Sequence, residues 1–141
     1  MWRLLHNLLP VEARLHRLKL ITSDRCQRCT SDTRGDLSHA LLSCPTYSEG
    51  FNFFLQCVRM LVPDIQPDNL LYLDYNCETS SELPVLWLTA TCLSLLWSLR
   101  AEKKPCLPHT IRAELEAKIT LLRETRHRDT MTIVQNVLLA I

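Results

Sequence analysis

Residues 24–44 read DRCQRCTSDTRGDLSHALLSC and bring three cysteines and one histidine into a short segment. Two residues separate the first two cysteines, nine residues then precede the histidine, and four more precede the last cysteine. Cysteines spaced in this way can turn both sulfurs toward one ion, and three thiolates with one imidazole form a closed tetrahedral set that is typical of structural zinc sites. The segment therefore predicts a structural Zn²⁺ bound by Cys26, Cys29, His39 and Cys44.

The residues around the second ligand pair fit this prediction. Asp36 or Ser38 can cap a short helix in which His39 occupies the first turn. Residues five apart on a regular helix do not share a face, so His39 and Cys44 need a break in the helix between them. Pro45 predicts that break, because proline disfavours the helical conformation in the residue before it.

Redox chemistry and chance proximity are the two alternatives to zinc binding for these cysteines. A redox-active Cys-x2-Cys pair usually lies between a strand and a helix of an α/β fold, and no strand pattern accompanies this pair. Chance proximity stays open because the chain holds seven cysteines in all. Cys57, Cys77, Cys92 and Cys106 lack ligand spacing, and the first and third of them fall on apolar helix faces, where small core residues are expected.

Helical periodicity covers most of the remaining chain. Only two glycines occur among 141 residues, while seven prolines mark the turns. The apolar spacing predicts helices over residues 2–9, 10–21, 45–62, 82–100, 110–128 and 131–141, with a turn-rich connector after residue 62. The expected fold class is all-α, a small helical domain with an N-terminal Cys3His zinc-knuckle-like loop. A zinc-binding module over residues 1–62 would carry a helical extension, residues 63–141, packed on it.

Residues 83–99 contain no charged side chain. A helix needs about twenty apolar residues to span a bilayer, and this stretch is shorter and is diluted by Thr89, Thr91, Ser94 and Ser98. We therefore expect a buried core helix and no membrane. The first residues also lack the small-residue cleavage site of a signal peptide. The cysteines are accordingly expected to be reduced in an intracellular protein, with nucleus and cytoplasm both open.

Basic residues are concentrated at the start of the chain. The overall net charge of +1 excludes a uniformly basic, histone-like protein, but residues 1–34 carry seven Lys or Arg against three acids. Such a stretch is either a solvated helix face or a surface that binds nucleic-acid phosphates. The candidate phosphate contacts are Arg14, Arg17, Lys19, Arg25, Arg28 and Arg34. The last three of these residues can also offset the negative charge of the zinc site.

These motifs follow one another in a known order. A tryptophan-led apolar stretch precedes LPVEARLHRL (residues 9–18), CQRC (residues 26–29) and HALLSCP (residues 39–45). In this order they resemble the zinc-binding segment that follows the polymerase in non-LTR (LINE-like) retrotransposon reverse transcriptases. The resemblance is best over residues 2–62 and looser over LLWSLRAEKK (residues 95–104). It implies the same four zinc ligands that the spacing predicts.

The resemblance implies a zinc-stabilised C-terminal module of such a reverse transcriptase, a fragment that binds element RNA or target DNA and packs on the polymerase portion of its parent protein. Polymerase activity is not expected, because two-metal phosphoryl transfer needs paired aspartates and the sequence contains no Asp-Asp. No other nucleophile and base form a set, so we expect no enzyme. Two alternatives remain, a purely structural protein-interaction module and a degenerate retroelement relic without activity.

Overall fold

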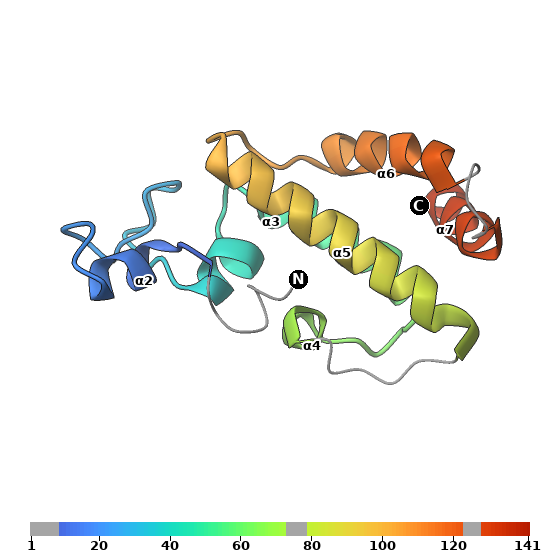
Figure 1. Ribbon diagram of the computed structural model, residues 1–141, viewed down its shortest axis with the longest axis horizontal. Helices are drawn as coiled ribbons and strands as arrows, with labels where there is room; N and C mark the ends of the chain where they lie inside the picture. Colours follow the sequence, from blue (N-terminus) through green and yellow to red (C-terminus); the bar gives the residue numbers. More distant parts are fainter. Residues whose placement is uncertain (1–8, 73–78, 123–127) are drawn as a thin grey trace.

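Helices form the regular structure of the described chain, which comprises residues 9–72, 79–122 and 128–141 of a computed structural model (Figure 1). Within these ranges the chain forms no strand, and its only isolated β-bridge joins Arg25 to Arg34. The all-α class is thus confirmed. The helices are α2 (Glu12–Arg17), the π-helix η1 (His39–Ser43), α3 (Ser48–Arg59), α4 (Pro67–Tyr72), α5 (Thr79–Ala101), α6 (Pro108–Leu122) and α7 (Arg128–Ala140).

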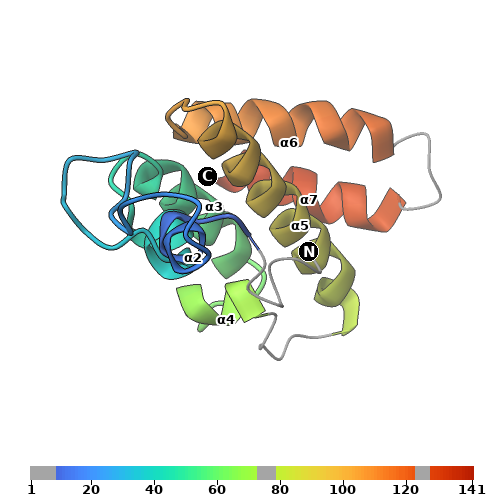
Figure 2. The same ribbon diagram turned by 60° about the vertical axis from the view of Figure 1, so that its left-hand side comes forward.

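The long helix α5 lies at the centre of the helical packing, where it contacts α3, α6, α7 and η1. In Figure 1, α2 and the loop after it lie at one end of the molecule, and α6 with α7 lie at the other. Figure 2 shows α6 and α7 running side by side, and the two helices are in contact. The loop between α2 and η1 therefore projects from one end of the packed helices, while η1 itself packs on α3 and α5.

The buried face of α5 shows why this helix occupies the centre. Val85, Leu88, Cys92 and Leu96 recur at helical spacing, and each is at most 1% exposed. One segment of the described chain, Glu82–Ala101, is long and apolar enough to cross a membrane, and half of it is buried inside the fold. The predicted core role of this helix agrees with its buried face, and the absence of a membrane stays a prediction.

A close backbone contact joins α3 to the connection before α6. Gly50 N donates a hydrogen bond to Cys106 O at 3.1 Å, and Cys106 N donates to Thr46 O at 3.3 Å. A Cβ atom at Gly50 would collide with Cys106 Sγ and would lie 2.8 Å from Cys106 O. Glycine is therefore needed here for close approach, and this contact sets the distance between α3 and α6.

Two helices begin or end elsewhere than the sequence predicts. The helix expected over residues 10–21 is the six-residue α2, because Lys19 has a positive φ of 58° that a continuing helix does not allow. The long apolar helix begins at Thr79, earlier than expected, and contains Pro84. Pro84 is the sixth residue of this helix, so its missing N–H removes one intrahelical hydrogen bond near the helix start.

The remaining boundaries also differ from the sequence prediction. The helix expected over residues 45–62 begins only at Ser48, after a turn. The helix expected over residues 110–128 begins at Pro108 and ends at Leu122, and α7 begins at Arg128. The helix expected over residues 2–9 falls almost wholly outside the described residues. A short helix in the connector, α4, is also present.

One apolar core joins the two predicted parts of the chain. Leu41 and Phe54 belong to residues 1–62, and Leu88 and Leu115 belong to residues 63–141, yet all four lie in the same cluster of buried side chains. The extension is therefore in direct contact with the metal-binding part. The boundary near residue 62 stays a prediction.

Candidate metal centre

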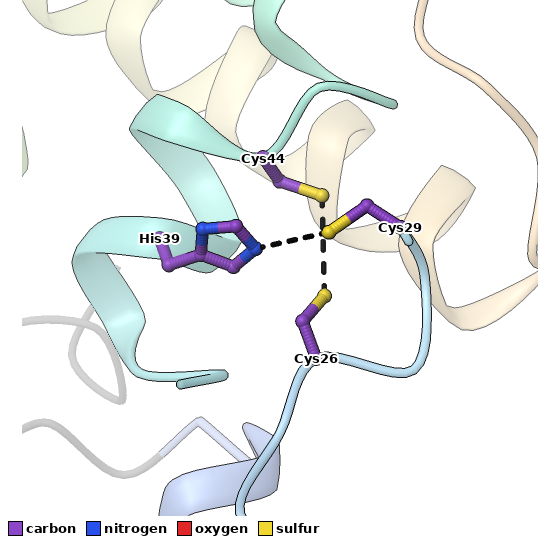
Figure 3. Close-up of side chains that lie close together, drawn as sticks. All are labelled: Cys26, Cys29, His39 and Cys44. Carbon is purple, nitrogen blue, oxygen red and sulfur yellow. Dashed lines mark hydrogen bonds between the residues drawn. The ribbon is translucent and has the colours of Figure 1, made fainter. Parts of the chain in front are cut away.

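The first two candidate ligands lie on a hairpin-like loop. The antiparallel bridge between Arg25 and Arg34 closes this loop, and Cys26 N donates a hydrogen bond to Thr33 O at 2.8 Å. In Figure 3 the sulfurs of Cys26 and Cys29 both point toward the imidazole of His39 and the sulfur of Cys44. The hairpin thus orients two thiols in one direction without help from a strand or a helix.

Gly35 attaches this hairpin to α2. Its amide donates to Asp24 O at 2.7 Å, and its carbonyl accepts a hydrogen bond from Ala13 N at 3.0 Å. A Cβ atom at Gly35 would lie 2.7 Å from Glu12 Oε2. The position therefore has room only for glycine while the Glu12 carboxylate stays where it is.

The second pair of ligands lies at the two ends of the π-helix η1. His39 N donates to Asp36 Oδ1 at 2.8 Å, so Asp36 caps this helix, as one of the two sequence predictions has it. Cys44 N donates to His39 O at 2.8 Å, a bond that spans five residues. Cys44 itself is extended, with φ −66° and ψ 121°, as expected before Pro45. The wide turn and the extended residue together bring His39 and Cys44 onto the same side.

The four predicted ligands meet at one point (Figure 3). Their ligand atoms all lie within 4.8 Å of one another. Cys26 Sγ is 4.0 Å from Cys44 Sγ, and Cys29 Sγ is 3.4 Å from His39 Nε2. Three of the four side chains are buried, and Cys29 is half-buried. Sequence spacing alone thus selected four residues that the fold brings together.

The distances suit a tetrahedral ion of zinc size. Zinc binds thiolate sulfur at about 2.3 Å, so two sulfurs on one tetrahedral ion lie about 3.8 Å apart. The observed 4.0 Å between Cys26 and Cys44 is close to that value. His39 faces the cysteines through Nε2. Ser43 Oγ lies 3.4 Å from Nδ1, where it can accept a hydrogen bond from the N–H of that nitrogen. The set of donors therefore fits a closed structural site with no position left for water.

The thiols of this site differ in acidity. Burial raises the pKa of Cys29, but hydrogen bonds from Ser31, His39 and Cys26 together lower it to about 6. Burial raises the pKa of Cys44 to about 11, and the neighbouring thiols add to this effect. Without a metal, Cys29 is therefore a thiolate near neutral pH while Cys44 keeps its proton. Metal binding must release that proton, so affinity should rise with pH.

A buried arginine from α5 contacts the site, and sequence analysis did not identify it. Arg100 Nη2 lies 3.8 Å from Cys26 Sγ, although 74 residues separate the two in sequence. The same nitrogen donates to Glu12 Oε1 at 2.8 Å and to Glu12 Oε2 at 2.6 Å. The one available signal was a charge at the end of the uncharged stretch of residues 83–99.

The predicted phosphate contacts surround the hairpin and the end of α2. Arg17, Lys19, Arg25 and Arg34 are exposed, whereas Arg14 and Arg28 are half-buried. Arg25 donates to Asp32 O at 2.7 Å, and Arg34 lies 3.4 Å from Asp24 Oδ2 in an exposed ion pair.

Arg28 is the least available of the six, because its Nε atom is buried without a hydrogen-bond partner in the described chain. The role of all six residues in nucleic-acid binding stays a prediction.

The cysteines outside the site are core residues where the structure describes them. Cys57, Cys92 and Cys106 are each 0% exposed. Burial raises the pKa of Cys57 and Cys106 to about 11, and it also raises the pKa of Cys92 well above its usual value. The core role predicted for Cys57 and Cys92 is confirmed, and Cys77 lies outside the described residues.

A comparison with known families supports the assignment of this site. Residues 1–49 match the family described as zinc-binding in reverse transcriptase. No curated protein and no solved structure matches the chain. The matched residues contain all four ligands, and the family describes a zinc-binding region rather than a catalytic domain. Residues 1–49 are therefore similar to a zinc-binding segment of the reverse transcriptase type.

Proposed function

We propose that this chain is a zinc-stabilised C-terminal module of a non-LTR retrotransposon reverse transcriptase. We further propose that the exposed basic residues on its hairpin and at the end of α2 bind element RNA or target DNA. The observation that carries the proposal is the convergence of three thiols and one imidazole inside the segment that matches the family. Zinc would supply structural rigidity when bound, because a closed Cys3His set leaves no position for a reacting water. We assign the chain no polymerase activity.

The exposed basic residues form two groups that support nucleic-acid binding. Arg25 and Arg34 face each other across the antiparallel bridge, an arrangement that places their side chains on one face of the hairpin. Arg17 and Lys19 lie at the end of α2, where the chain turns at Lys19. Long basic side chains of this kind contact phosphates and position a protein without reading bases. The expected binding is therefore sensitive to salt and tolerant of sequence.

Fluorescence anisotropy can test this proposal with labelled single-stranded RNA and labelled duplex DNA, each titrated with the zinc-loaded chain at increasing salt. We expect binding that weakens with salt. The double variant Arg17→Ala/Lys19→Ala should weaken binding and reduce the slope of log affinity against log salt by about two, one for each lost phosphate contact.

The matched control removes two charges from the connection between α5 and α6. Lys103 and Lys104 are exposed and lie outside the matched segment, so Lys103→Ala/Lys104→Ala should leave binding unchanged. The proposal is contradicted if the zinc-loaded chain binds neither nucleic acid at low salt, or if the two double variants behave alike.

One observation favours a second function, docking onto another part of a reverse transcriptase. Leu18 and Leu20 are 54% and 68% exposed at the end of α2, directly beside the basic residues. Adjacent exposed leucines are typical of protein interaction surfaces. The variant Leu18→Ser/Leu20→Ser distinguishes the two functions, because it should leave RNA and DNA binding intact while it abolishes self-association or docking.

A further inference from the structure

The outer side of the metal centre contains a buried ion pair that joins distant parts of the chain. The side chains of Arg100 and Glu12 are 5% and 8% exposed, and their closest atoms are 2.6 Å apart. Breaking a buried pair by removing one partner is strongly destabilising, because it leaves an unpaired charge without water. The pair therefore fixes the end of α5 against α2 and the metal-binding loop.

Glu12 also contacts the loop itself. Its Oε1 accepts a hydrogen bond from Gln27 N at 3.4 Å, between the first two ligands. Its side chain packs against Gly35, where an added Cβ would lie 2.7 Å from Oε2. One carboxylate thus bridges Arg100 on α5 and both sides of the hairpin-like loop that presents Cys26 and Cys29.

Arg100 is held in one orientation from two sides. Its guanidinium donates to Glu12 through Nη2 and lies over the ring of Tyr47 at 5.7 Å from the ring centre. This orientation places Nη2 3.8 Å from Cys26 Sγ, within reach of a charge-assisted hydrogen bond to a thiolate. The sulfur also accepts the Arg28 amide at 3.4 Å.

The charges of this cluster balance when a divalent ion is bound. Three thiolates, a neutral imidazole and a divalent ion carry one net negative charge, and Glu12 adds another. Arg100 and Arg28 supply two positive charges beside them, Arg100 from a buried position and Arg28 with a buried Nε atom.

We propose that Arg100, oriented by Glu12 and Tyr47, is a positioning residue for the metal centre, so that metal binding by the loop and docking of α5 stabilise each other. Coupling of this kind is reciprocal, because a contact that favours the bound ion is in turn favoured by it. The unit that binds the metal is therefore larger than the matched residues 1–49 and includes the end of α5. The inference rests on metal binding by the four ligands and is independent of nucleic-acid binding.

The test compares Zn²⁺ affinity in variants of the full chain, measured by competition with a chromophoric chelator at fixed pH. Arg100→Met should lower the affinity by about tenfold or more, the range that loss of an outer contact to a ligand produces. It should also shift the visible absorption bands of the Co²⁺-loaded protein, because these bands report the orientation of the thiolates. Arg100→Lys keeps the charge but not the forked geometry, and it should recover part of the affinity.

Arg112→Met is the matched control for lost packing. Arg112 lies on α6, over the Phe53 ring at 5.7 Å, and donates to Leu138 O at 3.0 Å. This variant should lower the melting temperature but leave Zn²⁺ affinity and the Co²⁺ spectrum unchanged. Equal losses of affinity in Arg100→Met and Arg112→Met would overturn the proposal, since they would indicate general destabilisation.

A second variant keeps the test decisive if Arg100→Met does not fold. The double variant Glu12→Gln/Arg100→Met removes both charges and leaves neither unpaired in the interior. We expect this double variant to fold and to show the same loss of Zn²⁺ affinity as Arg100→Met. Wild-type affinity together with a wild-type Co²⁺ spectrum in either folded variant would show that Arg100 has only a structural role. A zinc-loaded wild-type chain that binds neither RNA nor DNA would instead contradict only the proposed function.

Discussion

The metal loop, residues 24–44, and the helical core formed by α3, α5 and α6 are held together by different contacts. In the core, large apolar side chains such as Phe54, Leu88 and Leu115 are 0% exposed, and each contributes about 1.5–3 kcal/mol by leaving water. In the metal loop, regular structure is limited to the five-residue η1 and one isolated bridge. Three of its buried residues are the ligands Cys26, His39 and Cys44.

This difference shows what each region needs in order to stay folded. Apolar burial is enough to keep helices together without any bound group. Buried polar ligands stabilise a loop only when they have a partner, because an unsatisfied buried polar group costs free energy. The metal loop should therefore depend on an ion, and the helical core should not.

Removal of the metal should unfold the loop and leave the helices of the core formed. Structural zinc contributes about 10–16 kcal/mol in zinc-finger peptides, more than this short loop can replace by other contacts. Chelation, or the variant His39→Ala, should open the loop to trypsin at Arg25, Arg28 and Arg34, while the far-ultraviolet circular dichroism of the core helices persists. His109 is exposed and outside the loop, so His109→Ala is the control. Unchanged cleavage after chelation would contradict this prediction.

Thiol reactivity should separate the two regions in metal-free protein. Burial raises the pKa of Cys57 to about 11, and this residue stays buried in the core when the metal is removed. Cys29 lies in the loop that opens, so at pH 7 it should react with iodoacetamide at least about tenfold faster. Burial of Cys57 increases this ratio.

Mass spectrometry of the alkylated peptides measures these rates. Zinc should protect Cys29 and leave the slow rate of Cys57 unchanged. Equal reactivity of the two cysteines in folded, metal-free protein would remove the distinction between the regions.

A cavity in the core should lower global stability without weakening the metal site. Phe54 is fully buried, and its ring packs edge-to-face on Phe51 with the ring centres 5.7 Å apart. Phe54→Ala should lower the free energy of unfolding by about 3–5 kcal/mol, as measured by urea denaturation of the zinc-loaded protein. Its Zn²⁺ affinity under native conditions should equal that of the wild type. A weaker affinity would mean that the core determines the geometry of the ligands directly.

Loss of the helix cap in the metal loop should have the smallest effect. Asp36 accepts the amide of His39, whereas Ser38 makes no side-chain hydrogen bond of this kind. Asp36→Ala should destabilise the zinc-loaded protein by about 1 kcal/mol, and Asp36→Asn should retain most of the stability. Ser38→Ala is the control and should change little. Equal thermal stability of the alanine variants would show that the cap does not support η1.

The sequence was sufficient for the ligand set because the ligands are local. Cys26, Cys29, His39 and Cys44 lie on one short segment, and spacing limits how such side chains can meet. The break at Cys44 was equally local, since Pro45 adjoins it. The π-helix between His39 and Cys44 was not predicted, because it depends on where the two ligands must point rather than on residue propensity.

Features that depend on distant contacts were missed or misplaced. Glu12 and Arg100 pair across 88 residues, and no pattern along the chain links them. The early end of α2 depends on the backbone of Lys19, a residue with no preference for a positive φ. The start of α5 at Thr79 was placed three residues too late, because the uncharged apolar stretch that predicts this helix begins only at residue 83.

By itself, the sequence determined that this protein is helical, that one cysteine-rich loop interrupts the helices, and which four residues can meet around an ion. Helical periodicity and ligand spacing extend over only a few residues, so they can be recognised in the sequence without knowledge of the tertiary structure. Only the tertiary structure decided that a carboxylate on α2 and a guanidinium at the end of α5 lie beside that site. Such contacts form when apolar faces pack, and packing brings together residues whose separation along the chain carries no signal.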